Sequence, residues 1–358
     1  MKKKTLYHLF LCLLAAAFLV PCVALGDGGN LEITEIELNP DVKHWSVKDY
    51  SLPLDMDFKA VPGPKENGFA DSKDENGNPL YVYEDSTIRV VVSQTRYYLP
   101  GGKDKKGTTV WMADVVISDP SQLRTVAANG RFNLRDQKVS KPGVTLAGNV
   151  KAVVALSGDS WGASEKDGYG VIIRQGELIS CKLDSDGRRR MDLLLIDVNG
   201  DFHVLHAAQD GDLDNPLEYD GKQIIQGFSF GPVLVENGEA ITEYYGVDRN
   251  YSQKDGFWIK MNTDEPAQRM AFCQVGPLHY MAVATATAYK GNRGLTLPQF
   301  AQCLETLGVQ TAYNLDGGFT TLLYLHGHGD EGRINQKSTK ERSLWDLIYF
   351  VSAEGITK

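Results

Sequence analysis

Residues 312–324 read AYNLDGGFTTLLY, and the rest of the chain is organised around this stretch. The apolar run over residues 309–315 predicts a buried strand, and Asp316 follows directly where that strand ends. The paired glycines Gly317 and Gly318 let the backbone turn sharply and leave space for a ligand to approach it. A carboxylate, bare amides and two hydroxyls on one turn suit a polar ligand or chemistry on it. The same residues also suit a tight structural turn with a solvated Asp.

An amphipathic helix is predicted over residues 297–307, immediately before this stretch. Thr296 and Gln299 have the spacing of a capping box, and Pro298 lies in the first turn, where a missing N–H costs little. Gly308 supplies the left-handed residue that commonly ends a helix. The residues that recur on one face at helical spacing are all apolar: Leu297, Phe300, Ala301, Leu304 and Leu307.

The first 26 residues have the pattern of a secretory signal peptide. Three lysines precede an apolar run over 6–20, and Ala24-Leu25-Gly26 resembles a small-residue cleavage site. The apolar run is shorter than the roughly 20 residues that a bilayer crossing needs, so a retained membrane anchor is the weaker alternative. No other stretch predicts an integral membrane segment. The mature chain is therefore expected to be secreted, periplasmic or at the cell surface.

Charge and cysteine content restrict the partners. The formal net charge is −9 and becomes −12 once the signal segment and its three lysines are removed. So acidic a surface is ill suited to nucleic acid. Cys181, Cys273 and Cys303 remain in the mature chain, and their spacing indicates neither a disulfide framework nor a metal site. They are expected to be buried thiols.

The remaining chain divides into two parts. Residues 27–80 are rich in Pro, Gly, Asp and Lys and predict an N-terminal extension that packs on the domain or stays mobile. Residues 81–358 contain short β-type runs and hairpin turns such as Asn199-Gly200. A weaker helix is predicted near 217–226. The pattern indicates an α+β fold with a mixed, hairpin-rich β-sheet core and a few helices packed on it.

The order of the motifs along 81–358 resembles the phosphodiester glycosidase family. The sequence SGDSW over 157–161 comes first, and FGPVLV over 230–235 follows. QRMA over 268–271 and GLTL over 294–297 come next, and NLDGGFTT over 314–321 is last. The resemblance implies a hydrolase that acts outside the cytoplasm. It implies cleavage of a sugar, such as N-acetylglucosamine, from a sugar-1-phosphodiester, and relates the chain to exopolysaccharide-related bacterial proteins.

The resemblance also assigns site residues. Hydrolysis of a glycosidic bond usually needs two carboxyl groups, and Asp159 and Asp316 each follow a buried strand into a glycine-containing loop. Arg269 is the candidate partner of the departing phosphate, because a guanidinium matches phosphate bidentately. These three are the predicted catalytic residues. The predicted substrate-binding residues are Ser157, Gly158, Asn314, Gly317, Gly318, Thr320, Thr321 and Arg342, and Gly231 and Pro232 also match the family pattern.

Several alternatives remain open at this point. Ser157 stands where the family has Asn, and Phe319 is bulky where the family has a small residue. The altered first loop, with Ser157 and with Ser160 where the family has an aromatic residue, favours a rival function, a catalytically decayed carbohydrate- or cell-wall-binding protein on the same fold. No cofactor is certain. A divalent metal such as Ca²⁺ could be held by the acidic loops 184–187 or 210–214, and His326 and His328 are either a metal pair or solvated side chains.

Overall fold

The computed structural model describes residues 63–102, 104–128, 130, 139–159, 170–182, 192–206, 213, 215–244, 264–338 and 340–354. It also describes the backbone of an N-terminal hairpin, in which β1 (Leu19–Leu25) pairs antiparallel with β2 (Leu31–Glu37). The other residues of the predicted signal peptide lie outside the described residues. Within the described part of the chain, no helix is both long and apolar enough to cross a lipid bilayer.

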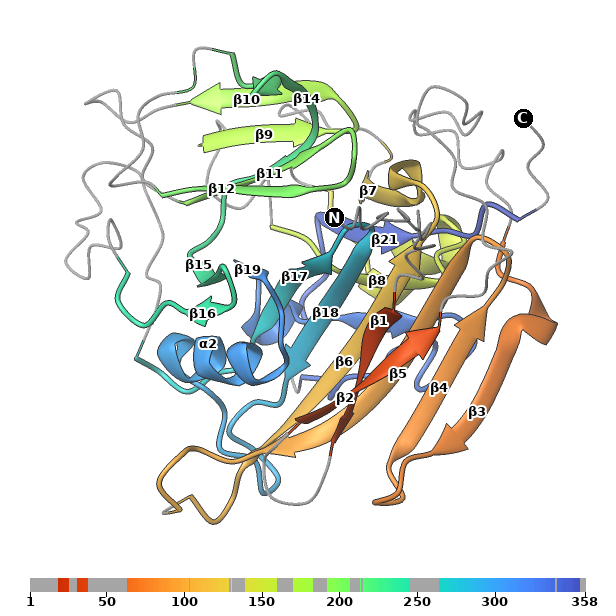
Figure 1. Cartoon of the computed structure of the whole chain (residues 1–358), viewed down its shortest axis with the longest axis vertical. Helices are drawn as coiled ribbons and strands as arrows, with labels where there is room; N and C mark the ends of the chain where they lie inside the picture. Colours follow the sequence, from red (N-terminus) through yellow and green to blue (C-terminus); the bar gives the residue numbers. More distant parts are fainter. Residues whose placement is uncertain are drawn as a thin grey trace, which may run out of the picture.

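The largest sheet has nine strands in the order β16-β15-β19-β17-β18-β6-β5-β4-β3. Its long central strands cross the middle of the molecule in Figure 1. Part of the segment 27–80 belongs to it, because β3 and the start of β4 form the edge of this sheet. Its strands are β3 (Phe69–Lys73), β4 (Pro79–Glu84), β5 (Ile88–Tyr97), β6 (Thr108–Ile117), β15 (Val233–Glu236), β16 (Glu239–Ala240), β17 (Met270–Gly276), β18 (His279–Thr285) and β19 (Thr311–Leu315).

Two smaller sheets complete the β structure. The first has the order β20-β8-β21-β7, and the second has the order β10-β9-β14-β11-β12 with β13 paired to β14. The first comprises β7 (Leu123–Ala127), β8 (Val154–Ser157), β20 (Leu323–Leu325) and β21 (Asp346–Phe350). The second comprises β9 (Gly170–Arg174), β10 (Glu177–Lys182), β11 (Leu193–Asp197), β12 (Phe202–Leu205), β13 (Glu218–Tyr219) and β14 (Lys222–Phe228).

The three sheets share one hydrophobic core. Val115 of β6, Leu156 of β8 and Leu194 of β11 are fully or almost fully buried in the same cluster, so each sheet contributes one face to it. Residues of β6 alternate between two cores: Val115 lies in this shared cluster, whereas Val110 and Met112 face the opposite side. This period-2 alternation is what a strand buried on both faces requires.

Two α-helices cover the outer faces. α2 (Leu297–Thr306) packs its apolar face on the far side of the nine-stranded sheet, where Figure 1 shows it beside β15 and β16. Its N-terminus has the predicted capping box. The Thr296 hydroxyl accepts a hydrogen bond from the Gln299 backbone N–H, and the Gln299 side chain accepts one from the Thr296 backbone N–H. α1 (Gly143–Asn149) covers the outer face of the four-stranded sheet through Leu146 and Ala147.

The hairpin-rich β core with a few helices is confirmed. Every strand pair that the structure describes is antiparallel, whereas a sheet with both parallel and antiparallel pairs was predicted. The helix predicted near 217–226 is wrong. Asp220 and Gly221 both have positive φ and reverse the chain between β13 and β14, and Ile224 is buried in β14 opposite Asp197 of β11. Strand pairing overrides the weak local helix signal there.

Candidate active site

Three segments that are distant in the sequence meet at one place. The Asp316 backbone N–H donates to the Gly158 carbonyl at 3.2 Å, and the Gly318 N–H donates to the Gln268 carbonyl at 2.8 Å. The Ser157 hydroxyl donates to the Asp316 carbonyl at 3.2 Å. The end of β8, the approach to β17 and the turn after β19 are therefore fixed against one another. These segments carry all three predicted catalytic residues.

The turn after β19 is compact because glycine is required in it. A Cβ on Gly317 would lie 2.8 Å from the Gln268 carbonyl oxygen, and Gly318 has a φ of +63°. A short 3₁₀ turn, Gly318–Thr320, follows, and the Thr320 hydroxyl donates to the Gly317 carbonyl at 2.7 Å. The Thr321 hydroxyl is buried and has no hydrogen-bond partner among the described residues. An unpaired buried hydroxyl costs free energy, and the burial of this hydroxyl separates it from solvent.

The two predicted catalytic carboxylates have different environments. Asp316 is half-buried on the turn and joined to the first loop through its backbone. The Asp159 side chain is only 1% exposed, forms an ion pair with Arg174 and accepts from the Ser229 backbone N–H at 3.2 Å. The loops that carry the two residues are adjacent. The Asp159 carboxylate is buried in an ion pair and the Asp316 residue is only half-buried, so the two carboxylates are suited to different roles.

Arg174 and Asp346 complete a buried ionic cluster that the sequence analysis missed. Arg174 lies at the end of β9, 3.3 Å from an Asp346 carboxylate oxygen, and its guanidinium is 4.3 Å from the Phe228 ring centroid. Burial, with the nearby Asp159 carboxylate, raises the pKa of Asp346 well above its usual range. A Cβ on Gly158 would overlap the Asp346 carboxylate, so this glycine is needed to bring the loop onto the cluster.

Arg269 stands at the start of β17, directly beside the glycine turn. A Cβ on Gly317 would be 3.4 Å from the Arg269 Cα. The guanidinium donates to the backbone carbonyls of Leu295 at 3.0 Å and Glu265 at 2.7 Å. Burial lowers the pKa of Arg269 to about 10, so the side chain is still protonated at neutral pH. The positive charge of Arg269 therefore lies in a mostly buried position next to the glycine turn.

Asn314 holds a second turn in place. Its side-chain amide donates to the Gly231 carbonyl at 2.8 Å and its backbone N–H donates to the Pro232 carbonyl at 3.0 Å. The Gly231–Pro232 peptide is cis. The neighbouring Tyr313 hydroxyl accepts from the Phe230 N–H at 2.8 Å and lies 2.7 Å from the Asp192 carbonyl. Asn314 is buried and supports the site by hydrogen bonding to the backbone carbonyls of the Gly231–Pro232 turn.

His206 links two sheets near this turn. Its Nε2 is 3.0 Å from Glu236 at the end of β15, and its Nδ1 is 3.7 Å from the Asp192 carboxylate. The interaction with Asp192, reinforced by Glu236, raises the pKa of His206 to about 9. The imidazole is therefore cationic at neutral pH and joins the six-stranded to the nine-stranded sheet.

Arg342 contacts the glycine turn at its outer end. Its backbone N–H donates to the Phe319 carbonyl at 2.9 Å, and its guanidinium lies 5.8 Å from the Phe319 ring centroid. This distance is within the range of a cation–π contact. Arg342 is exposed, unlike the nearly buried Asn314. The structure therefore brings it to the turn but on the solvent side.

The described residues contain no group of three His, Cys, Asp or Glu side chains that could hold a metal ion, so they do not support the predicted metal sites. The acidic loops 184–187 and 210–214 lie outside the described residues, except for Leu213. The His328 Nε2 is 2.7 Å from the Asp71 carboxylate, and its ring packs against Phe69 and Tyr81. This histidine therefore secures the β3–β4 edge.

Cys273 and Cys303 are free thiols. Cys273 and Cys303 are buried, and burial raises the pKa of both. The expectation of buried thiols is confirmed for these two and is wrong for Cys181, which is exposed in β10 at the edge of the six-stranded sheet.

Fold and site together define a β-rich protein with a carboxylate, an arginine and a glycine turn gathered at one point. Residues 150–351 match the model of the phosphodiester glycosidase family, so the chain belongs to that family. The match spans β8, β17 and the turn after β19, which supply the three converging segments. No curated protein sequence matches the chain significantly.

Two solved structures are similar to this chain at low sequence identity. The zebrafish N-acetylglucosamine-1-phosphodiester alpha-N-acetylglucosaminidase catalytic domain, auto-inhibited by its pro-peptide, is 16% identical with a TM-score of 0.48. That alignment covers 82% of this chain and 87% of the zebrafish chain. A hypothetical protein from Synechocystis is 16% identical with a TM-score of 0.46, covering 80% of this chain and 68% of the other.

Proposed function

We propose that this protein is an exported hydrolase that cleaves a sugar from a sugar-1-phosphodiester. Family membership supports the reaction class. The single observation that carries the proposal is the convergence of Asp316, Arg269 and the Gly317–Thr321 turn through backbone hydrogen bonds. A half-buried carboxylate, an arginine and two threonines belong to this turn and its neighbours, and this set of groups supports a proposed role in binding a glycosyl phosphodiester.

Asp316 is the proposed reacting carboxylate. It would activate a water molecule or attack the anomeric carbon itself, while the bond between that carbon and the phosphate oxygen breaks. The phosphate leaves with the bonding electrons as an anion, and water supplies the hydroxyl and the proton of the products. Because a phosphate is already a good leaving group, a strong general acid is less necessary than a cation. Arg269, cationic at neutral pH, would stabilise the departing phosphate.

Asp159 is proposed to act by positioning. Its carboxylate is enclosed by Arg174 and the Ser229 N–H, so it holds the Ser157–Asp159 loop against β9 and β14. The Ser157 hydroxyl bonds to the Asp316 carbonyl and fixes the reacting turn in the same way.

A carbohydrate-binding protein without activity is the second candidate. The burial of Asp159 favours it, because only one of the two predicted carboxylates is accessible to a substrate. The two candidates differ in turnover. Both require recognition of a sugar phosphodiester, and only the first releases the sugar.

The test measures release of N-acetylglucosamine from its 1-phosphate methyl diester. Wild type is compared with Asp316→Asn and with Asp220→Asn, a matched control at the exposed β13–β14 turn. We expect a loss of at least about a hundredfold in kcat for Asp316→Asn, in the range typical of an acid/base residue, and the wild-type rate for the control. Binding without release by wild type would favour the second candidate. Repeating the assay with EDTA tests for a metal requirement.

Export is proposed on the sequence pattern of residues 1–26. The measurement is N-terminal sequencing of the protein recovered from outside the cytoplasm. A mature chain that begins near Asp27 is the expected result, and an intact N-terminus would contradict it.

A further inference from the structure

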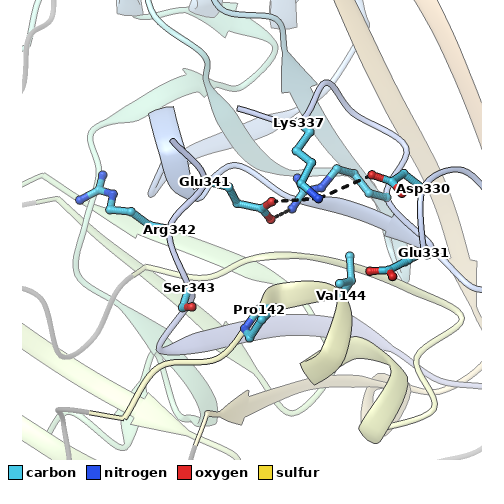
Figure 2. A pocket seen from close by; sticks show the side chains of 9 residues that line it. Pro142, Val144, Asp330, Glu331, Lys337, Glu341, Arg342 and Ser343 are labelled. Carbon is cyan, nitrogen blue, oxygen red and sulfur yellow. Dashed lines mark hydrogen bonds and ion pairs between the residues drawn. The ribbon is translucent and has the colours of Figure 1, made fainter. Parts of the chain in front are cut away.

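A charged pocket of about 280 Å³ lies beside the candidate active site. It opens between the start of α1, the loop after β20 and the loop before β21. The volume is near the lower end of the roughly 300–1,000 Å³ found for small-molecule sites. The residues that line it are Pro142, Val144, Asp330, Glu331, Arg333, Lys337, Glu341, Arg342 and Ser343. Figure 2 shows Asp330, Lys337 and Glu341 grouped on one side, with Pro142 and Val144 on the other and Glu331 beside Val144, whereas the Arg342 side chain extends away from this group.

Arg333 connects this pocket to the glycine turn. It is 5% exposed, and its Nη1 donates to the Thr321 carbonyl at 3.0 Å. It also forms an ion pair with Glu341. Lys337 lies 3.7 Å from both the Asp330 and the Glu341 carboxylates. The charged wall is therefore a connected network anchored by one buried arginine.

The charges of the pocket cancel. Its lining contains three cations and three carboxylates, so its formal charge is zero. An inorganic anion placed there would meet three carboxylates, and a cation would meet three basic groups. A neutral ligand with several hydroxyls can donate to the carboxylates and accept from Lys337 at the same time. The apolar wall of Pro142 and Val144 suits the less polar face of such a ligand.

Glu331 is held at this pocket by a tight turn. Asp330 and Arg333 exchange backbone hydrogen bonds of 3.1 and 2.9 Å across Glu331 and Gly332, which both have positive φ. A Cβ on Gly332 would overlap the Tyr324 ring, so the turn is packed closely on β20. Left-handed backbone is unfavourable for a Glu residue. The turn fixes the backbone of Glu331, whose exposed side chain is among the lining groups of the pocket.

Phe319 connects the pocket to the reacting turn. It is 43% exposed on the Gly317–Thr321 turn and carries the Arg342 guanidinium over its ring. Arg342 is in turn a lining residue of the pocket. An exposed aromatic ring three residues after Asp316 offers an apolar surface to a ligand that extends from the turn to the pocket.

We propose that this pocket is a second carbohydrate-binding site, specific for a neutral sugar residue and separate from the site at Asp316. The charge balance excludes a phosphate-binding role and the mixture of donors and acceptors fits a hydroxyl-rich ring. The binding is independent of hydrolysis. It would let the protein hold a glycan next to the reacting turn.

The test is binding of neutral methyl glycosides of glucose, galactose, mannose and N-acetylglucosamine, measured by saturation-transfer NMR and calorimetry. Inorganic phosphate is the anionic probe. Ser343→Trp fills the pocket, and Ser72→Trp is the matched control on the exposed edge strand β3. Glu331→Gln removes one carboxylate and keeps the size of the side chain. Asp316→Asn serves as the background that lacks the proposed reacting group.

We expect at least one glycoside to bind wild type and Asp316→Asn equally. Ser343→Trp and Glu331→Gln should each weaken that binding at least tenfold, and Ser72→Trp should leave it unchanged. Binding of none of the four glycosides would overturn the proposal. So would glycoside binding that both pocket variants retain, or phosphate binding that Ser343→Trp abolishes. A pocket that binds sugar in a protein without turnover would refute the proposed hydrolase and leave this inference intact.

Discussion

Two arginines in this protein are each surrounded by acidic side chains, and their surroundings differ in burial. Arg174 lies between Asp159 and Asp346, and the three side chains are at most 2% exposed. Arg333 pairs with Glu341, whose side chain is 24% exposed, and Lys337 beside them is 58% exposed. The first cluster has one cation and two carboxylates. In the second cluster, Glu341 interacts with two cations, Arg333 and Lys337, and is partly exposed to water.

The comparison shows how burial changes what similar groups do. Removal of water penalises an unbalanced charge, and the pKa of Asp346 is accordingly raised. That cluster ties β9, β21 and the Ser157–Asp159 loop together and has no access for a ligand. The open cluster is screened by solvent and adds little to stability. It is instead accessible, which a binding pocket needs.

The largest expected effect is from Arg174→Met. Removing the arginine leaves Asp159 and Asp346 as buried carboxylates without their cation, and loss of one partner of a buried pair typically costs about 3–5 kcal/mol. Urea unfolding at pH 7 measures the change in the free energy of unfolding. Arg333→Met is the comparison variant, and we expect a smaller loss because Glu341 retains contact with Lys337 and solvent. Equal losses of unfolding free energy in the two variants would contradict the proposed difference between the buried and the open cluster.

Asp346→Asn tests the raised pKa of the buried cluster. A carboxyl whose pKa is raised by folding keeps a proton that the unfolded chain releases above about pH 3.9. Its contribution to stability is therefore complete at low pH and is lost as the pH rises toward the folded-state pKa. Asn does not titrate, so the variant should lose less stability than wild type between pH 4 and 8. The difference can reach about 1.4 kcal/mol per pH unit.

Urea unfolding at several pH values checks this prediction. Subtracting the two profiles removes the contribution of titrating groups that do not interact with Asp346. Parallel profiles for wild type and Asp346→Asn would show that Asp346 does not hold the proton.

The smallest effect is expected from Lys337→Ala in the open cluster. Lys337 forms only long, exposed ion pairs, and such pairs contribute about 0–1 kcal/mol. We expect a change in the free energy of unfolding below about 0.5 kcal/mol, with little dependence on salt. A loss comparable to that of Arg333→Met would show that the network, rather than Arg333 alone, supports the loop.

Local patterns predicted much of the secondary structure. The helix at 297–307 is confirmed over Leu297–Thr306, because its cap, apolar face and terminating glycine are all encoded within a dozen residues. The Asn199-Gly200 hairpin is confirmed for the same reason. The segment 217–226 failed, because its strand identity depends on pairing with β11, which no local pattern contains.

The buried cluster shows where sequence analysis of the site stopped. Arg174 and Asp346 are 172 positions apart, and neither has a motif of its own. A signal was present, since Arg174 ends the apolar run GVIIR and Asp346 begins DLIYF. A single charge beside a fully buried strand indicates a buried partner without identifying it. The roles of Asp159 and Asp316 as reacting groups stay predictions.

By itself, the sequence determined the hairpins, the capped helix, the glycine turn after β19 and the family. These depend on residues that are close in the chain, where propensity and turn geometry act directly. Only the tertiary structure decided that Asp159 is enclosed by Arg174 and Asp346 while Asp316 stays accessible. Burial sets the electrostatic environment of a carboxylate, and burial depends on which strands pack together across long sequence separations.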